Sequence, residues 1–411
     1  MHILIVTQYF WPENFRINDL ALGMLELGHQ VTVLTGAPNY PNGSFFEGYG
    51  YFNKQQDYHG VKVLRVPLMP RGNGGGLRLA LNYISFAFTA SVLGPLLCKE
   101  KVDQIFVFEP SPITVGIPAL ILKKLKSAPI LFWVQDLWPE SLSATGAVRS
   151  KTVLALVAHL VKFIYGRCDR ILVQANSFYG SILQQGGKED SILYFPNSAE
   201  SIFTMPAAVS LHVPPLPDGF RIMFAGNIGS AQDFETIISA AETLQQHKDI
   251  HWIIVGDGRM RGWAEAEAKI RGLGNNVHFL GRHPLDDMPA FFNKADSLLV
   301  TLKKEPIFAL TIPSKIQSYL ACGRPIIAAL EGEGATVIEE AGAGYACPCG
   351  DPDALAQAVL RMYRTPKSER EEMGAKGRKY YETNFDRDML LERLDGWMRS
   401  LAVNDRGDNN G

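Results

Sequence analysis

Short apolar runs alternate with amphipathic stretches along the first 200 residues. Consecutive apolar residues predict a buried strand, and apolar positions that recur every three or four residues predict a helix. The predicted strands are 2–7, 31–34, 61–66, 104–108, 130–134, 170–173 and 192–195. The predicted helices are 15–28 (with Asn14 as its N-cap), 77–98, 112–125, 152–165 and 177–185. Continuous apolar strands between helices predict a parallel sheet covered on both faces.

The same alternation restarts near residue 220. The predicted strands are 221–225, 251–255, 277–280, 297–301 and 325–328, and the predicted helices are 233–246, 259–272, 286–294, 314–322 and 351–364. The fold class is therefore α/β, with two Rossmann-like domains whose parallel sheets face a central cleft. Ligands of such sheets bind beyond the carboxyl ends of the strands.

The domain limits follow from a change in composition after residue 195. Residues 196–219 are rich in proline, and their apolar residues show neither helical nor strand spacing. We therefore place a linker at 201–219, between domains 1–200 and 220–385. We expect a helix over 386–401 to pack back on the N-terminal domain. The polar end, 403–411, is predicted to be disordered.

Composition narrows the class of protein. A chain of 411 residues exceeds what one core supports, which agrees with two domains. The net charge of −2 argues against a nucleic-acid binder. Five scattered cysteines without a C-x-x-C pair, and an N-terminus without signal-peptide features, predict a cytoplasmic protein.

Two glycine-rich loops follow successive strands of the second domain. Phe224-Ala-Gly-Asn-Ile-Gly229 comes directly after one strand, and Val255-Gly-Asp-Gly258 comes after the next. Glycine allows the backbone to approach a ligand closely, and amides before a helix favour anions. The two loops together favour a nucleotide or phosphate site, although glycine is also the ordinary residue of such turns.

Lys315 lies in the first turn of the helix that begins after Pro313 at Ser314. The helix dipole disfavours a cation there, so its presence suggests a bound anion. Attraction to a diphosphate ~4 Å away, about 4 kcal/mol per charge pair, would outweigh the dipole. The alternative is a solvated surface lysine.

The first domain offers one ionisable candidate and one loop. Asp136, after strand 130–134, is a candidate acid, base or charge stabiliser, or else a structural carboxylate. The loop after the first strand contains Tyr9, Glu13 and Asn14, which could grip a sugar acceptor or form a rigid loop. It lacks the dinucleotide fingerprint. The D-x-D segments 351–353 and 386–388 are interpreted as helix caps, so no metal site is expected.

Two helical segments are unusually apolar. Residues 77–98 are nearly long enough to span a membrane, but Arg78, Asn82 and Gly94-Pro95 interrupt them, and 152–165 is also apolar with basic neighbours. Buried core helices are one interpretation. Docking on an anionic membrane surface is the other.

The chain resembles the family-4 retaining glycosyltransferases, which have the GT-B fold. The resemblance rests on LGHQVTVLT, QDLWPES, FAGNIG, IVGDGRMR, VHFLGRHP and PSKIQSYLACGRPII, and covers all but the tail. The last segment is most similar to enzymes of O-antigen, capsule and colanic-acid synthesis, including the fucosamine transferases.

The resemblance implies a UDP-sugar donor, such as an N-acetylated amino or deoxyamino sugar, and no cofactor or metal ion. The nucleotide sugar would contact Gly226, Asn227, Gly229, Gly256, Asp257, Arg282, Ser314, Lys315, Gln317 and Ser318. Lys315 and Asp136 would be catalytic. The acceptor would be a glycan on undecaprenyl diphosphate at the inner face of the membrane, held near Tyr9, Glu13 and Asn14.

The sequence departs from the family pattern at two glutamates eight residues apart, which fall on Leu310 and Ser318. Gln317 and Ser318 are our substitutes for their contacts. Asn227 and Gln232 lie where arginine and lysine are common, and Gln135 replaces a histidine before Asp136. A UDP-sugar 2-epimerase of the same fold and a non-catalytic two-lobed sugar-binding protein remain the alternative functions.

Overall fold

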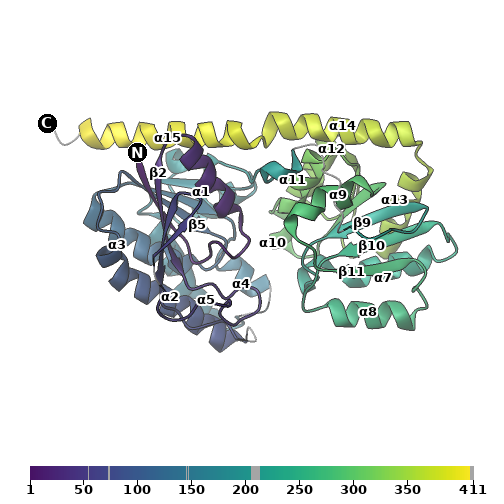
Figure 1. The fold of residues 1–411 in the computed structure, drawn as a ribbon, viewed down its shortest axis with the longest axis horizontal. Helices are drawn as coiled ribbons and strands as arrows, with labels where there is room; N and C mark the ends of the chain where they lie inside the picture. The colour runs from purple at the N-terminus through teal and green to yellow at the C-terminus, as the bar shows by residue number, and fades with distance from the viewer. Residues whose placement is uncertain (54, 73–74, 145, 147, 205–212, 408–411) are drawn as a thin grey trace. The chain divides into compact units, whose positions relative to one another are not determined.

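The computed structural model describes all residues except 54, 73–74, 145, 147, 205–212 and 408–411, and no side chains are described at 403–407 (Figure 1). The chain forms two compact units. Unit 1 contains Met1–Pro196 and Asp388–Gly411, and unit 2 contains Asn197–Arg387. Part of the expected linker 201–219, namely 205–212, lies outside the described residues.

Unit 1 is built on an eight-stranded sheet in the order β3-β4-β2-β1-β5-β6-β7-β8. The strands are β1 His2–Val6, β2 Gln30–Gly36, β3 Gln56–Tyr58, β4 Val61–Val66, β5 Gln104–Glu109, β6 Ile130–Val134, β7 Arg170–Val173 and β8 Ile192–Tyr194. All neighbours pair in parallel except β3, which is antiparallel to β4. The sequence did not predict this short edge strand. The strand order reverses between β1 and β5, which is where sheets of this kind bind ligands.

Helices cover both faces of this sheet. They are α1 Arg16–Glu26, α2 Gly76–Leu97, α3 Gly116–Lys126, α4 Glu140–Ala144, α5 Lys151–Tyr165, α6 Phe178–Gln184 and α15 Arg387–Gly407. One core contains side chains of α1, α15 and alternate strand residues such as Ile3 and Ile5. On the other face, α2 packs beside α3, and α3 contacts α5.

Helix α15 belongs to unit 1 although it follows unit 2 in the chain. Leu390, Leu391, Leu394 and Met398 lie in the core with α1. The His29 ring nitrogen Nε2 lies 2.9 Å from the Asp395 carboxylate of this helix. The helix continues to Gly407, so the stretch predicted to be a disordered tail begins as helix, and only its end lies outside the described residues.

Helix α2 has two different sides. Among the described residues it is the one helix that has both the length and the apolar composition to cross a bilayer. Its inner side, including Asn82 and Phe86, is buried. The opposite side carries exposed Leu77, Leu81, Ile84, Phe88, Val92 and Leu96. One side of this helix is therefore buried, as the core interpretation predicts, and the other side is exposed.

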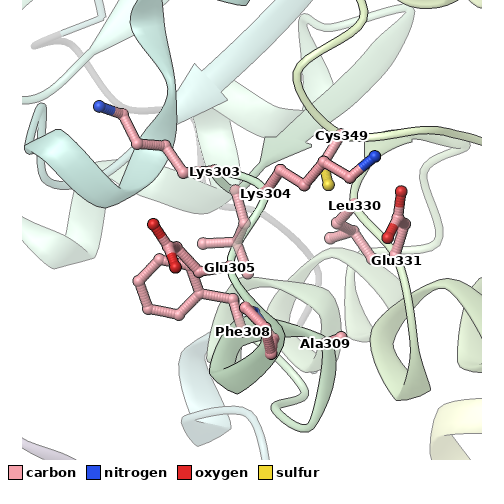
Figure 2. Close-up of a pocket in the computed structure, with 10 residues that line it drawn as sticks. Lys303, Lys304, Glu305, Phe308, Ala309, Leu330, Glu331 and Cys349 are labelled. Atoms are coloured by element: carbon pink, nitrogen blue, oxygen red, sulfur yellow. The ribbon is translucent and has the colours of Figure 1, made fainter. Parts of the chain in front are cut away.

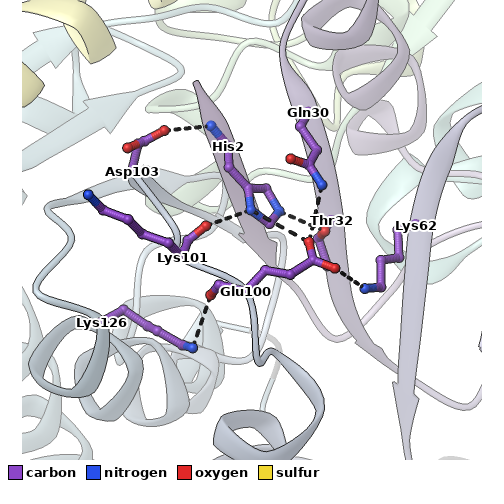
Figure 3. A network of polar contacts seen from close by, with 8 residues as sticks. All are labelled: His2, Gln30, Thr32, Lys62, Glu100, Lys101, Asp103 and Lys126. Atoms are coloured by element: carbon purple, nitrogen blue, oxygen red, sulfur yellow. Dashed lines mark hydrogen bonds and ion pairs between the residues drawn. The ribbon is translucent and has the colours of Figure 1, made fainter.

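Polar contacts close the amino edge of the unit 1 sheet (Figure 3). The His2 amide donates to Asp103 at 2.8 Å, and the His2 ring contacts Thr32 at 2.9 Å. Glu100 pairs with Lys62 at 2.6 Å and accepts from Gln30. These polar groups at the starts of the strands are paired with one another. The opposite, carboxyl edge of the sheet is therefore the edge that we consider for a ligand site.

Unit 2 contains a six-stranded parallel sheet in the order β11-β10-β9-β12-β13-β14. The strands are β9 Phe220–Ala225, β10 Ile250–Val255, β11 Val277–Gly281, β12 Ser297–Thr301, β13 Ile326–Ala329 and β14 Gly344–Cys347. The helices are α7 Phe234–Thr243, α8 Arg261–Ile270, α9 Met288–Asn293, α10 Pro306–Ala309, α11 Ser314–Ala321, α12 Glu333–Glu340, α13 Pro352–Arg364 and α14 Lys367–Asn384. The order reverses between β9 and β12, so the glycine loop after β9 lies at the reversal.

Candidate functional site

The two predicted glycine loops meet at the carboxyl edge of the unit 2 sheet. The Gly226 amide donates to the Val255 carbonyl at 2.8 Å, and the Ile228 amide donates to the Asp257 backbone carbonyl at 2.8 Å. Gly226 and Gly256 have φ angles of +132° and +146°. A Cβ at Gly256 would lie 1.9 Å from the Gly226 carbonyl oxygen, so backbone contact requires glycine here.

Lys315 lies directly against this loop. A Cβ at Gly226 would be 2.7 Å from Cε and 3.0 Å from Nζ of Lys315. The ammonium nitrogen also lies 3.5 Å from the centre of the Phe224 ring. The sequence prediction that helix α11 brings a lysine to the glycine loop therefore agrees with the geometry.

The Lys315 ammonium has no hydrogen-bond partner among the described residues. The residue as a whole is half-buried, but its nitrogen is shielded from solvent. Burial lowers the pKa of Lys315 to about 7. Burying an amine without a carboxylate partner costs free energy of folding, so the position of the Lys315 amine requires an explanation.

The remaining loop residues are accessible. Gly226, Asn227, Asp257 and Arg282 are exposed, and Gly229 and Gly256 are partly exposed. The Asn227 side chain lies between Gly229 and Gly258, since a Cβ at either position would come within 2.6 Å of it. Arg282 follows β11 on the same edge.

Helix α11 corrects one of our predicted contacts. Ser314 is exposed at the helix start, but Gln317 is fully buried. With its amide nitrogen turned inward, Gln317 donates to the Ser314 and Pro313 carbonyls at 3.2 Å. Ser318 is nearly buried and contacts the Ser314 carbonyl at 3.5 Å. Gln317 therefore cannot replace a family glutamate, because it faces the interior and caps its own helix.

A cavity of ≈ 240 Å³ opens on the same edge, and the sequence did not reveal it (Figure 2). It is lined by Leu302, Lys303, Lys304, Glu305, Pro306, Phe308, Ala309, Leu330, Glu331 and Cys349. Figure 2 shows Lys304, Glu331 and Cys349 grouped on one side. The Lys303 amide donates to the Ala231 carbonyl at 2.9 Å, so the cavity adjoins the glycine loop.

In unit 1, Asp136 follows β6 at the carboxyl edge. Ser141 donates to its Oδ1, and the residue is half-buried. Burial raises the pKa of Asp136 to about 6, against hydrogen bonds that lower it. The hydrogen bond from Ser141 fits the interpretation as a structural carboxylate, and the raised pKa fits the interpretation as a functional acid. By contrast, Asp351 accepts from the Ala354 amide at 2.9 Å, which confirms that it caps α13.

The acceptor loop residues have different environments. Glu13 is buried and accepts from the Asn39 and Tyr40 amides at 2.8 and 2.7 Å. Burial raises the pKa of Glu13 to about 7, despite these bonds. It therefore joins two loops and is not free to contact a sugar. Asn14 is exposed, and Phe15 rather than Asn14 is the N-cap of α1.

Tyr9 belongs to an aromatic group around Arg71, which the sequence did not single out. Tyr9 stacks on Phe15 at 4.9 Å and is nearly buried. Arg71 donates to the Tyr9 hydroxyl at 3.1 Å and lies 5.0 Å from the centre of the Tyr40 ring. Tyr9 is therefore packed within the loop, which fits the interpretation of a packed structural loop.

Comparisons with known proteins cover most of the chain. The family model "Glycosyl transferase 4-like domain" matches residues 14–198, and "Glycosyl transferases group 1" matches 219–365. The putative colanic acid biosynthesis glycosyl transferase WcaI of Escherichia coli K12 is 26% identical over 96% of this chain and 98% of its own length. The probable glycosyltransferase WbjE of Pseudomonas aeruginosa is 28% identical over 65% of this chain and 67% of its own.

Solved structures share the fold. Sucrose-phosphate synthase of Thermosynechococcus elongatus superposes with a TM-score of 0.72 at 16% identity, over 98% of this chain and 99% of that one. Anabaena HepE in complex with UDP-glucose gives 0.68 at 16% identity, over 97% and 100%. The chain therefore has the GT-B fold and belongs to the family-4 glycosyltransferases.

Proposed function

We propose that this enzyme is a retaining glycosyltransferase that uses a UDP-sugar and a lipid-linked glycan acceptor in bacterial surface polysaccharide synthesis. The observation that carries the proposal is the unpartnered Lys315 ammonium beside Gly226. A diphosphate seated on the exposed glycine loop is the partner this cation lacks. The lysine and the loop amides form a site of positive potential at the reversal of the sheet.

UDP is the nucleotide we propose because HepE of similar fold was solved with UDP-glucose. The names of WcaI and WbjE support a polysaccharide product and glycosyl transfer. We assign the sugar ring of the donor, an N-acetylated amino or deoxyamino sugar such as N-acetylfucosamine, to the cavity that adjoins the glycine loop. Its polar lining, with Lys304, Glu305 and Glu331, suits hydroxyl and amide groups.

In the reaction we propose, the bond from the anomeric carbon to the β-phosphate oxygen breaks and a bond to the acceptor oxygen forms on the same face. Negative charge grows on the departing phosphate, where Lys315 and the loop amides stabilise it. The acceptor proton passes to that phosphate. Asp136, ionised above pH ~6, stabilises the positive charge that develops on the sugar ring.

The acceptor carries a lipid, and unit 1 has a surface that fits a bilayer. Helices α2, α3 and α5 contact one another in series and contain no Asp or Glu. Their exposed apolar residues include Ile84 and Phe88 on α2 and Leu156 and Phe163 on α5. Their basic residues are Arg78, Lys123, Lys124, Lys126, Lys151 and Lys162. Lys123 is paired with Asp169, and the other basic residues leave an excess of positive charge on this apolar surface. Such a surface favours the anionic cytoplasmic face of the inner membrane.

The substrate assignment predicts nucleotide selectivity and a requirement for acceptor. In calorimetry against UDP, GDP and ADP, we expect UDP to bind most tightly. Product analysis with UDP-sugar alone should show no epimerised sugar, and transfer should require a lipid-linked glycan. Preference for GDP would change the donor, and conversion of the donor sugar without acceptor would indicate an epimerase.

Lys315→Met tests the diphosphate site. We expect kcat to fall by ~10²–10³, the scale of one lost oxyanion donor. We also expect the melting temperature to rise, because the variant no longer buries an unpaired amine. Lys269→Met, on the exposed surface of α8, is the matched control and should leave both unchanged. Near-normal turnover with saturating donor would remove Lys315 from the mechanism.

Vesicle binding tests the membrane surface. With vesicles containing phosphatidylglycerol, we expect binding that weakens with salt, and little binding to phosphatidylcholine alone. Ile84→Glu and Phe88→Glu should each weaken binding by about tenfold or more, the scale of one buried apolar side chain. Ile270→Glu changes an even more exposed isoleucine of unit 2 and should have no effect. Equal loss in all three variants would contradict a specific surface.

A further inference from the structure

Glu109 is a buried carboxyl group that the mechanism above does not use. It ends β5, and its side chain is 0% exposed. Neither carboxyl oxygen has a hydrogen-bond partner among the described residues. An isolated carboxylate is expensive to bury, so such a group keeps its proton instead.

The position of Glu109 in the sheet brings it next to Asp136. Glu109 pairs in register with Val134 of β6, and its carbonyl accepts from the Gln135 amide at 3.0 Å. Asp136 is the next residue of the chain. Burial raises the pKa of Glu109 well above its usual range, and the charge of Asp136 raises it further, while the Asp136 backbone amide acts in the opposite direction.

Other groups in this neighbourhood are also acidic or neutral. Tyr165 of α5 interacts with Glu109, Asp136, Glu140 and Cys168, and burial raises the pKa of Tyr165 strongly. The Tyr165 hydroxyl and Glu140 Oε2 are buried without a hydrogen-bond partner among the described residues. The interactions that set the pKa of Glu109 include no cation. Among the described residues, the groups that act on Glu109 therefore supply no positive charge to keep it ionised beside Asp136.

We propose that Glu109 is a positioning residue for Asp136, a carboxylic acid that stays protonated while Asp136 is ionised. The two carboxyl groups then carry one negative charge between them. The Glu109 hydroxyl donates toward the Asp136 carboxylate, directly or through one buried water, and holds its charge at the carboxyl edge of the sheet. The proposal relies on the role of Asp136 in the proposed function.

Two substitutions separate this role from simple packing. Glu109→Gln keeps the shape, the neutrality and a hydrogen-bond donor. Glu109→Leu keeps only apolar bulk, so ionised Asp136 loses a hydrogen bond and its pKa rises. Asp136→Asn serves as the reference for complete loss of the charge.

The pH dependence of kcat/KM for transfer is the readout. We expect Glu109→Gln to keep the acidic limb near pH 6, within about 0.3 units, because nothing ionisable is lost. Glu109→Leu should move that limb up by about one to two units, so that activity below it falls at least tenfold. A downward shift in Glu109→Gln would mean that Glu109 is ionised, and an unshifted limb in Glu109→Leu would mean that it only fills space. Either result overturns the proposal.

Infrared spectroscopy gives a readout that needs no transferase activity. At neutral pH the wild type should show a protonated-carboxyl band that is absent in Glu109→Gln. If wild type and variant have the same spectrum, Glu109 is not protonated and the proposal fails. If the band is present but no transfer to any acceptor occurs, the proposed function fails and the protonation state of Glu109 stands.

Discussion

The anion-binding site that we propose in unit 2 depends on one ammonium group, that of Lys315, which has no carboxylate partner among the described residues. Lys315 is held against Gly226 and Phe224, where neither solvent nor a described side chain accepts its hydrogen bonds. The glycine loops must lack side chains for this approach to occur, and the reversal of the strand order leaves the edge open. A folded protein that keeps such a group gives up stability at this point, and the anion that we propose would supply the missing interaction.

Unit 1 differs from unit 2 in the charge of the groups at the carboxyl edge of its sheet. Its carboxyl edge collects buried acids, with Glu13 bonded to loop amides and Glu109 and Asp136 in adjacent positions. Of these three acids, Asp136 is the one that is partly exposed to solvent, and its pKa is raised to about 6. The outer layer of α2, α3 and α5 is apolar and basic, so each surface of the unit is suited to a different ligand chemistry.

The sequence predicted the fold better than it predicted individual contacts. Continuous apolar runs specify strands of a parallel sheet because both of its faces are covered. Every predicted strand is present, and the strands that the sequence missed are β3 and β14 at the sheet edges. The direction in which a helical side chain points is harder to predict from sequence. Gln317 was assigned to the ligand, but its side chain faces the interior. Asn14 was expected to cap α1 but is one residue too early.

Some features leave little signal in a single sequence. The cavity beside the glycine loop is formed by segments after β12, β13 and β14, which only the folded sheet brings together. Glu109 did leave a signal that was missed, a charged residue that ends an apolar strand at its carboxyl end. Such a position faces the ligand edge of a parallel sheet, so a carboxyl group there is a candidate by location alone.

The pKa of Lys315, followed by NMR of its side chain with and without UDP, tests the central claim most directly. The account predicts a pKa of about 7 in the free protein and a large upward shift with UDP, because the diphosphate favours the charged form. UDP binding should therefore take up a proton near pH 8, and its affinity should fall as the pH rises above 7. A pKa near the usual lysine value that does not change with UDP would contradict the account.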